Sequence, residues 1–73
     1  MENLIRYIDN LYKWSTQTPQ FAKTFYNEAF GAFQFYILDR GLSGDEYTEL
    51  ETLWNTKYRP NFEAIIYGGA ENA

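Results

Sequence analysis

The chain contains no cysteine and no histidine among its 73 residues. These two absences exclude disulfide bonds, thiolate nucleophiles, zinc sites built from cysteine or histidine, and imidazole groups acting as acids or bases. A chain of 8.6 kDa is also too short for more than one domain. Most familiar catalytic and metal-binding chemistry is therefore excluded before any pattern is considered.

Basic charge is scarce as well. Six Lys and Arg residues stand against ten Asp and Glu residues, which gives a formal net charge of −4 at pH 7. Only Lys57 and Arg59 lie close together in the sequence. Proteins that hold nucleic acid usually carry a basic patch that neutralises phosphates. We therefore expect no direct binding of DNA or RNA.

The chain has no hydrophobic run of the length that a membrane span needs. Its longest apolar stretch, residues 29–38, is interrupted by Gln34 and is about half of the roughly 20 residues that cross a bilayer as a helix. Glu2 stands where a secretory signal peptide would be positively charged. These features predict a cytoplasmic protein that does not associate with membranes.

Aromatic residues are what the chain has in abundance. Two Trp, seven Tyr and six Phe make up 21% of the sequence, within a hydrophobic fraction of 45%. Each large ring can bury roughly 150–250 Å² on folding, so this composition is not that of a disordered chain. The aromatic residues predict a folded domain with a ring-rich core.

Hydrophobic periodicity predicts three helices, over about residues 2–15, 19–40 and 44–67. Strand-like alternation of apolar and polar residues is almost absent from the sequence. Short connections make neighbouring helices run in opposite directions, so the predicted fold is all-α, a small antiparallel three-helix bundle. We expect a single helical domain over residues 1–69 and a frayed tail over residues 70–73.

Residues at the two connections are typical of helix ends. Thr18 is suited to cap the second helix, with Pro19 at its first position. Gly41 is suited to end that helix in a left-handed conformation. Ser43 and Glu46 have the spacing of a capping box at the start of the third helix.

The third helix contains a proline, and two outcomes are open. Pro60 would allow one kinked helix that continues to Tyr67, or a break near Arg59 followed by a short fourth helix. Gly68 and Gly69 are expected to end the helical order.

The aromatic residues fall into two groups. One group is expected in the core: Phe25, Phe33, Tyr36, Tyr47 and Trp54. The other group lies where apolar helix surface meets polar surface, and we predict that it binds a partner protein or a second copy of the chain: Tyr7, Trp14, Phe30 and Phe35. Three thin helices offer too little interior to bury every ring.

Four acidic residues are concentrated early in the third helix: Asp45, Glu46, Glu49 and Glu51. One interpretation is an acidic patch that imitates nucleic-acid phosphates or meets a basic partner. The other, which we favour, is that the helix dipole stabilises negative charge in the first turns of a helix.

Sites for metals and catalysis are weakly indicated at best. The loop that starts at Asp39 resembles a calcium loop only faintly, since its third position is Gly41 and its twelfth is Leu50. Ser15 and Ser43 have no histidine to activate them. We therefore expect no metal, no cofactor and no enzyme activity.

These observations predict a small acidic, non-enzymatic protein that acts through protein–protein interaction. It would serve as an adaptor or regulator, or as a homodimer, and would use an aromatic helix face. The alternative is an acidic inhibitor, of the kind that phages and mobile elements encode, which blocks a nucleic-acid-binding surface of a host protein.

Overall fold

The computed structural model describes residues 2–42 and 44–71 of the chain, and almost all of them are helical. In these ranges only Thr18, Gly41 and Leu42 lie outside a helix, and no residue is part of a strand. The predicted all-α bundle is therefore confirmed.

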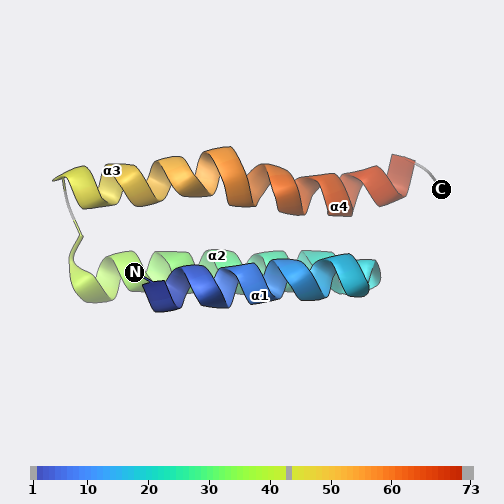
Figure 1. Cartoon of the computed structure of the whole chain (residues 1–73), viewed down its shortest axis with the longest axis horizontal. Coiled ribbons are helices and arrows are strands. Elements are labelled where there is room, and N and C mark those ends of the chain that lie inside the picture. Colours follow the sequence, from blue (N-terminus) through green and yellow to red (C-terminus); the bar gives the residue numbers. More distant parts are fainter. Residues whose placement is uncertain (1, 43, 72–73) are drawn as a thin grey trace.

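Three long helical segments form the molecule (Figure 1). In chain order the elements are α1 (Glu2–Gln17), a 3₁₀ turn (Pro19–Phe21), α2 (Ala22–Arg40), α3 (Gly44–Leu53), a π-helical turn (Trp54–Tyr58) and α4 (Arg59–Glu71). In Figure 1 the chain runs left to right along α1, returns along α2, and runs left to right again along α3 and α4. The result is a rod of 42 × 18 × 16 Å.

Helix α1 buries one row of residues and continues to Gln17, two residues beyond the predicted end. The buried row is Leu4, Ile8, Leu11 and Ser15. Spacings of four, three and four residues keep a row on one side of an α-helix. The polar member of the row is satisfied within the helix, because the Ser15 hydroxyl donates to the Leu11 carbonyl oxygen at 2.9 Å.

The connection between α1 and α2 differs from the prediction. Thr18 makes no side-chain capping bond to the following helix. Its hydroxyl instead donates to the Trp14 carbonyl oxygen at 2.8 Å, which also accepts the Thr18 N–H at 2.8 Å, so that Thr18 is bound to the end of α1. Pro19 begins a 3₁₀ turn, and α2 itself begins at Ala22. Thr18 therefore occupies the predicted N-cap position before Pro19, but its side chain does not cap the helix that follows.

The connection between α2 and α3 contains two glycines with positive φ. Gly41 has φ 61° and ψ 39°, and its N–H donates to the Ile37 carbonyl oxygen, so the predicted left-handed C-cap is confirmed. Gly44, the first residue of α3, has φ 63°. Ser43 lies outside the described residues, and its capping box with Glu46 stays a prediction.

The third helical segment passes through Pro60 without a break (Figure 1). Of the two predicted alternatives, the break near Arg59 is wrong and a helix that continues past the proline to Tyr67 is confirmed, with a widened turn just before Pro60. Proline lacks an N–H, and its ring would collide with the carbonyl four residues earlier, that of Thr56. The π turn Trp54–Tyr58 directly precedes this point, and the Arg59 N–H donates to the Trp54 carbonyl oxygen, five residues back. The wider turn gives the proline ring the space it needs.

The same segment continues past the glycine pair. Helix α4 includes Gly68 and Gly69 and extends to Glu71, so these glycines do not end the helix as predicted. A glycine inside a helix costs only about 1 kcal/mol relative to alanine, which an established helix tolerates. Residues 72–73 of the predicted frayed tail lie outside the described residues.

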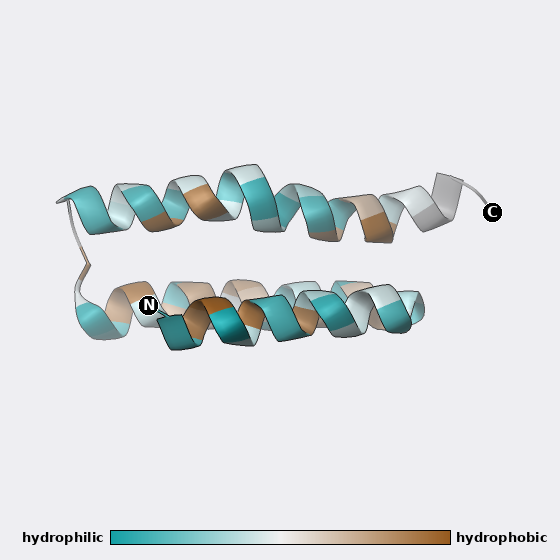
Figure 2. Ribbon diagram, in the orientation of Figure 1, coloured by the Kyte–Doolittle hydropathy of each residue, from teal (hydrophilic) through white to brown (hydrophobic). Residues whose placement is uncertain are grey.

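The core is a single cluster shared by all the helical segments. Its buried members are Leu4, Ile8, Leu11, Ala29, Phe33, Leu50, Trp54, Tyr58 and Phe62. Hydrophobic positions recur along each helix between hydrophilic ones (Figure 2). In the described ranges, no helix combines the length and the apolar character that crossing a membrane requires.

The five aromatic residues predicted to be buried have three different outcomes. Phe33 and Trp54 are buried in the core, and Phe25 and Tyr36 are partly buried against it. Tyr47 is exposed, so its prediction is wrong. Tyr47 lines an open groove between α2 and α3.

Candidate functional site

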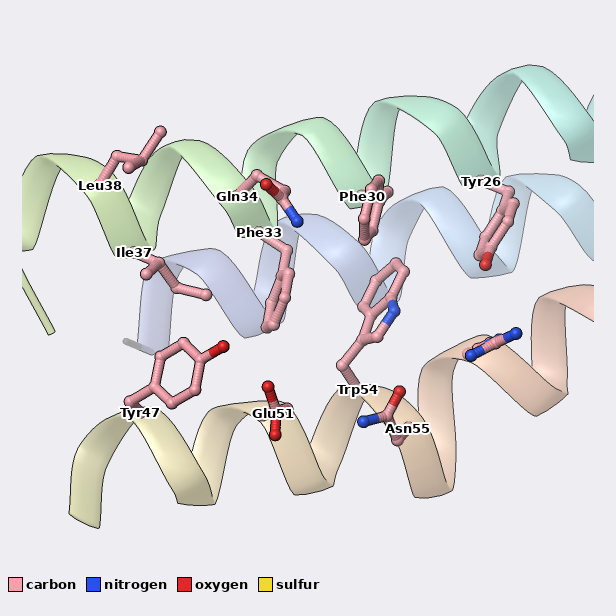
Figure 3. A pocket seen from close by; sticks show the side chains of 11 residues that line it. Tyr26, Phe30, Phe33, Gln34, Ile37, Leu38, Tyr47, Glu51, Trp54 and Asn55 are labelled. Atoms are coloured by element: carbon pink, nitrogen blue, oxygen red, sulfur yellow. The ribbon is translucent and has the colours of Figure 1, made fainter. Parts of the chain in front are cut away.

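A groove of about 470 Å³ lies between α2 and the segment formed by α3 and the π turn (Figure 3). Its lining residues are Tyr26, Phe30, Phe33, Gln34, Ile37, Leu38, Tyr47, Glu51, Trp54, Asn55 and Arg59. Seven of these residues are aromatic or aliphatic and four are polar or charged, so the groove presents both apolar and polar surface.

Trp54 forms the floor of this groove. It is 4% exposed, and its ring stacks on Phe33 at 5.1 Å between centroids and on Tyr26 at 5.8 Å. Phe30 lies against the same ring at 5.5 Å, tilted by 39°. In Figure 3 the indole projects from its helix toward Phe30 and Phe33. Rings packed in this way make a rigid apolar floor.

The rim of the groove consists of large apolar side chains that remain exposed. These are Phe30 and Leu38 on α2 and Tyr47 on α3. Figure 3 shows Tyr47 and Glu51 side by side on α3. Hydrogen bonding between the Tyr47 hydroxyl and the Glu51 carboxylate, followed by the charge of that carboxylate, raises the pKa of Tyr47. The rim therefore combines exposed apolar side chains with the negative charge of the Glu51 carboxylate.

Polar groups close the end of the groove that lies toward α4. Asn55 and Arg59 line it there, and the Arg59 Nε donates to the Glu63 Oε1 atom at 2.8 Å. Because Arg59 is already paired, Glu51 is the carboxylate lining the groove that a basic partner could neutralise.

A second hollow of about 340 Å³ lies between α1 and α2. It is lined by Asn3, Leu4, Tyr7, Ala32, Phe35, Tyr36, Asp39 and Arg40. The Arg40 guanidinium lies over the Tyr36 ring, 5.4 Å from its centroid. This hollow is smaller than the groove and involves a different side of α2.

The four aromatic residues predicted to bind a partner are all exposed, but they do not form one face. Their exposed fractions lie between 42% and 69%. Tyr7 and Phe35 line the second hollow, Phe30 lines the groove, and Trp14 packs against Phe25 at 6.1 Å between ring centroids. The structure thus divides the predicted set among three places.

The predicted acidic patch is divided in the same way. Of its four members only Glu51 lines the groove. Asp45 and Glu46 lie in the first turn of α3, where the helix dipole favours negative charge. Glu49 is exposed on the same helix.

Two rim residues were not predicted as site residues: Leu38, which is 79% exposed, and Tyr47. A signal for each exists in the sequence. Leu38 follows Gln34, which also lines the groove, by four residues and so shares its side of the helix. Tyr47, Glu51 and Asn55 follow one another at four-residue spacing, which marks one edge of α3.

Within the ranges 2–42 and 44–71, no three acidic side chains are grouped so that they could hold a metal ion.

An ion pair between Lys57 Nζ and Asp9 Oδ1, at 4.0 Å, links the π turn to α1. Both side chains are about half exposed, so this pair contributes little to stability.

Tyr58 is the buried polar group next to the floor of the groove. Its ring centroid lies 6.3 Å from that of Trp54, and its hydroxyl oxygen completes no hydrogen bond of ordinary geometry. Burial raises the pKa of Tyr58 to about 12, with smaller contributions from weak hydrogen bonding to Asp9 and from the charge of that carboxylate.

This pKa leads to a prediction for alkaline solution. An unfolded tyrosine titrates near pH 10, whereas the folded chain holds Tyr58 neutral up to about pH 12. Its contribution to stability is complete below pH 10 and is lost as the pH rises through 12, because the unfolded chain releases the proton first. Urea midpoints should therefore fall more steeply between pH 10 and 12 for the wild type than for Tyr58→Phe.

Tyr67→Phe provides the control, because Tyr67 is exposed. It should keep the steep fall of the wild type. At pH 7, Tyr58→Phe should be neutral or stabilising by up to about 1 kcal/mol, since it removes a buried hydroxyl that lacks a good partner. Equal slopes for Tyr58→Phe and the wild type would contradict the prediction.

Comparison of the chain with models of protein families, with curated proteins and with solved structures finds no significant match.

Proposed function

We propose that this small acidic protein acts without catalysis, as an adaptor or regulator that binds a helical segment of a partner protein in the groove between α2 and α3. The observation that supports this most is the exposed apolar rim around a buried aromatic floor. Exposed apolar surface that surrounds a hollow on a small domain usually marks an interaction site.

A helix is the occupant that fits the shape of the groove. Its two walls are themselves helices, so a third helix laid along them would complete a bundle-like arrangement. Helices bound in this way insert apolar anchors at positions i, i+3 or i+4, and i+7. The Trp54 ring and its neighbours offer a flat surface for such anchors.

The charges indicate the character of the partner. Glu51 lines the groove, and the chain carries a net charge of −4. A partner helix with lysine or arginine beside its apolar anchors would be attracted to this surface and oriented on it. The alternative function, an acidic inhibitor that imitates nucleic acid, has weaker support, because only one of the four predicted acids lies at the groove.

A displayed library of helical peptides tests the proposal. Selection against the wild type should yield amphipathic helices with apolar anchors and basic flanks. Asn55→Trp would fill the groove with a large ring and should weaken these peptides by about tenfold or more, which corresponds to about 1.4 kcal/mol. Thr52→Trp is the matched control, since Thr52 is an exposed residue of α3 that does not line the groove.

Thr52→Trp should bind the selected peptides as the wild type does. Circular dichroism of both variants would check that the helices are intact. Peptides that bind both variants equally well would contradict the groove as the binding site, and a library that yields no helical binder would contradict the proposed function.

A further inference from the structure

The π turn deprives one backbone carbonyl oxygen, that of Asn55, of its usual helical donor. In an α-helix this oxygen would accept the N–H four residues later, that of Arg59. The Arg59 N–H donates instead to the Trp54 carbonyl oxygen. A π-helical bond would come from the residue five positions later, but that residue is Pro60, which has no N–H. The Asn55 carbonyl oxygen is therefore an acceptor that the helical backbone does not use.

Side-chain donors beside this carbonyl are directed elsewhere. The Thr56 hydroxyl donates to the Thr52 carbonyl oxygen at 2.7 Å, and the Arg59 Nε atom donates to the Glu63 Oε1 atom at 2.8 Å. A backbone carbonyl in contact with water is hydrated, but it needs a new donor once another molecule covers it.

The carbonyl lies on the side of the helix that borders the groove. Helical carbonyl groups point along the axis toward the N–H about one turn later, so the Asn55 oxygen lies between the side chains of residues 55 and 59. Both of these residues line the groove. Figure 3 shows Glu51 and Asn55 one after the other on the same helix. The unused acceptor and the Glu51 carboxylate therefore border one groove, about one turn apart.

We propose that the Asn55 carbonyl oxygen selects a lysine side chain on the partner helix, an inference that rests on the proposed function of the groove. A lysine ammonium group has three donors and no acceptor, and its hydrogen bonds are strengthened by its charge. Glu51 attracts this charge, and Glu63 balances that of Arg59. A helix without a donor at this point would cover the carbonyl and leave it unpaired, which opposes its binding.

Pro60→Ala tests the carbonyl without any partner. The new N–H stands five residues after Asn55, where it completes the π-helical bond; a turn that instead returned to α-helical geometry would pair the same oxygen with the Arg59 N–H. The carbonyl ¹³C resonance of Asn55 should therefore move downfield in this variant. Pro19→Ala is the matched control, because Pro19 does not line the groove, and it should leave this resonance unchanged.

Helical peptides selected against the wild type test the partner contact. In each peptide one lysine at a time is replaced by norleucine. For one lysine the replacement should weaken binding about tenfold both to the wild type and to Glu51→Gln, which separates its contact from pairing with Glu51. In Pro60→Ala the two peptides should bind equally well, since the carbonyl is already paired. Asn55→Ala should keep the tenfold difference, because it removes the side chain and retains the backbone carbonyl.

Three results would overturn the inference. The first is an Asn55 carbonyl resonance that is the same in Pro60→Ala and the wild type. The second is a lysine preference that disappears entirely in Glu51→Gln. The third is a preference that persists in Pro60→Ala or is lost in Asn55→Ala. Peptides that bind the groove while any of these results is found would leave the proposed function intact, whereas a library without binders would contradict both.

Discussion

Replacing Trp54 with alanine is expected to lower the free energy of unfolding by about 3–5 kcal/mol, the range for removing a large buried ring. Trp54 touches more rings than its neighbours do, and it joins α2 to the third helical segment through Phe33, Tyr26 and Phe30. A chain of this size has roughly 4–11 kcal/mol of stability in total. The variant should therefore be partly unfolded at 37 °C, as a urea titration followed by circular dichroism would show.

Tyr47→Ala is the matched control, because Tyr47 lines the same groove but is exposed. Its loss should cost less than about 1 kcal/mol. If the two substitutions destabilise the chain equally, Tyr47 packs in the core as the sequence first indicated, and the groove is closed in solution.

Ala29→Leu is expected to lower the free energy of unfolding by about 1–3 kcal/mol. Ala29 is completely buried in the core cluster, and its small side chain lets the packed helices approach closely. A larger aliphatic group has no space to occupy, so neighbouring rings or helices must shift. Thermal melting gives a direct measure of the loss.

Ala64→Leu makes the same chemical change at an exposed position of α4. Surface substitutions of this kind usually change stability by no more than about 0.5 kcal/mol. A melting temperature lowered equally by both substitutions would show that Ala29 is not confined. A melting temperature that falls further for Ala29→Leu than for Ala64→Leu would show that the core around Ala29 is closely packed.

The sequence predicted the first helix well because its buried row obeys simple α-helical geometry. Spacings of four, three and four residues between Leu4 and Ser15 fit a period of 3.6. Gly41 was predicted for an equally local reason, since a left-handed residue after a helix strongly favours glycine. Thr18 holds the predicted N-cap position but makes no capping bond, because its hydroxyl could pair either with the helix before it or with the helix after it, and local sequence does not decide between them.

The π turn was not predicted, although the sequence contains a signal for it. The buried residues of the third segment are Leu50, Trp54, Tyr58 and Phe62, each four positions after the last. In an α-helix every such step drifts by about 40° around the axis, so the row would turn away from the core. A turn that holds more residues corrects this drift, and the π turn that does so begins at Trp54 and ends at Tyr58, two residues before Pro60.

The candidate site was predictable only in part, because exposure depends on how far apart helices lie. Periodicity assigned Tyr47 and Trp54 to the same inward side of one helix. The structure buries Trp54 and leaves Tyr47 at the rim, since α2 covers one and not the other. The separation of two helices is a tertiary property that a one-dimensional pattern does not contain.

The open groove also divides the molecule into regions of unequal local stability. Helix α3 buries only Leu50 of its own residues, whereas the segment after it buries Trp54, Tyr58 and Phe62. The start of α3 is therefore expected to open more readily than the core segment that follows it. A ligand in the groove would hold this end in place and suppress its fluctuations. Part of the binding free energy would then offset the conformational entropy that α3 loses when it becomes ordered.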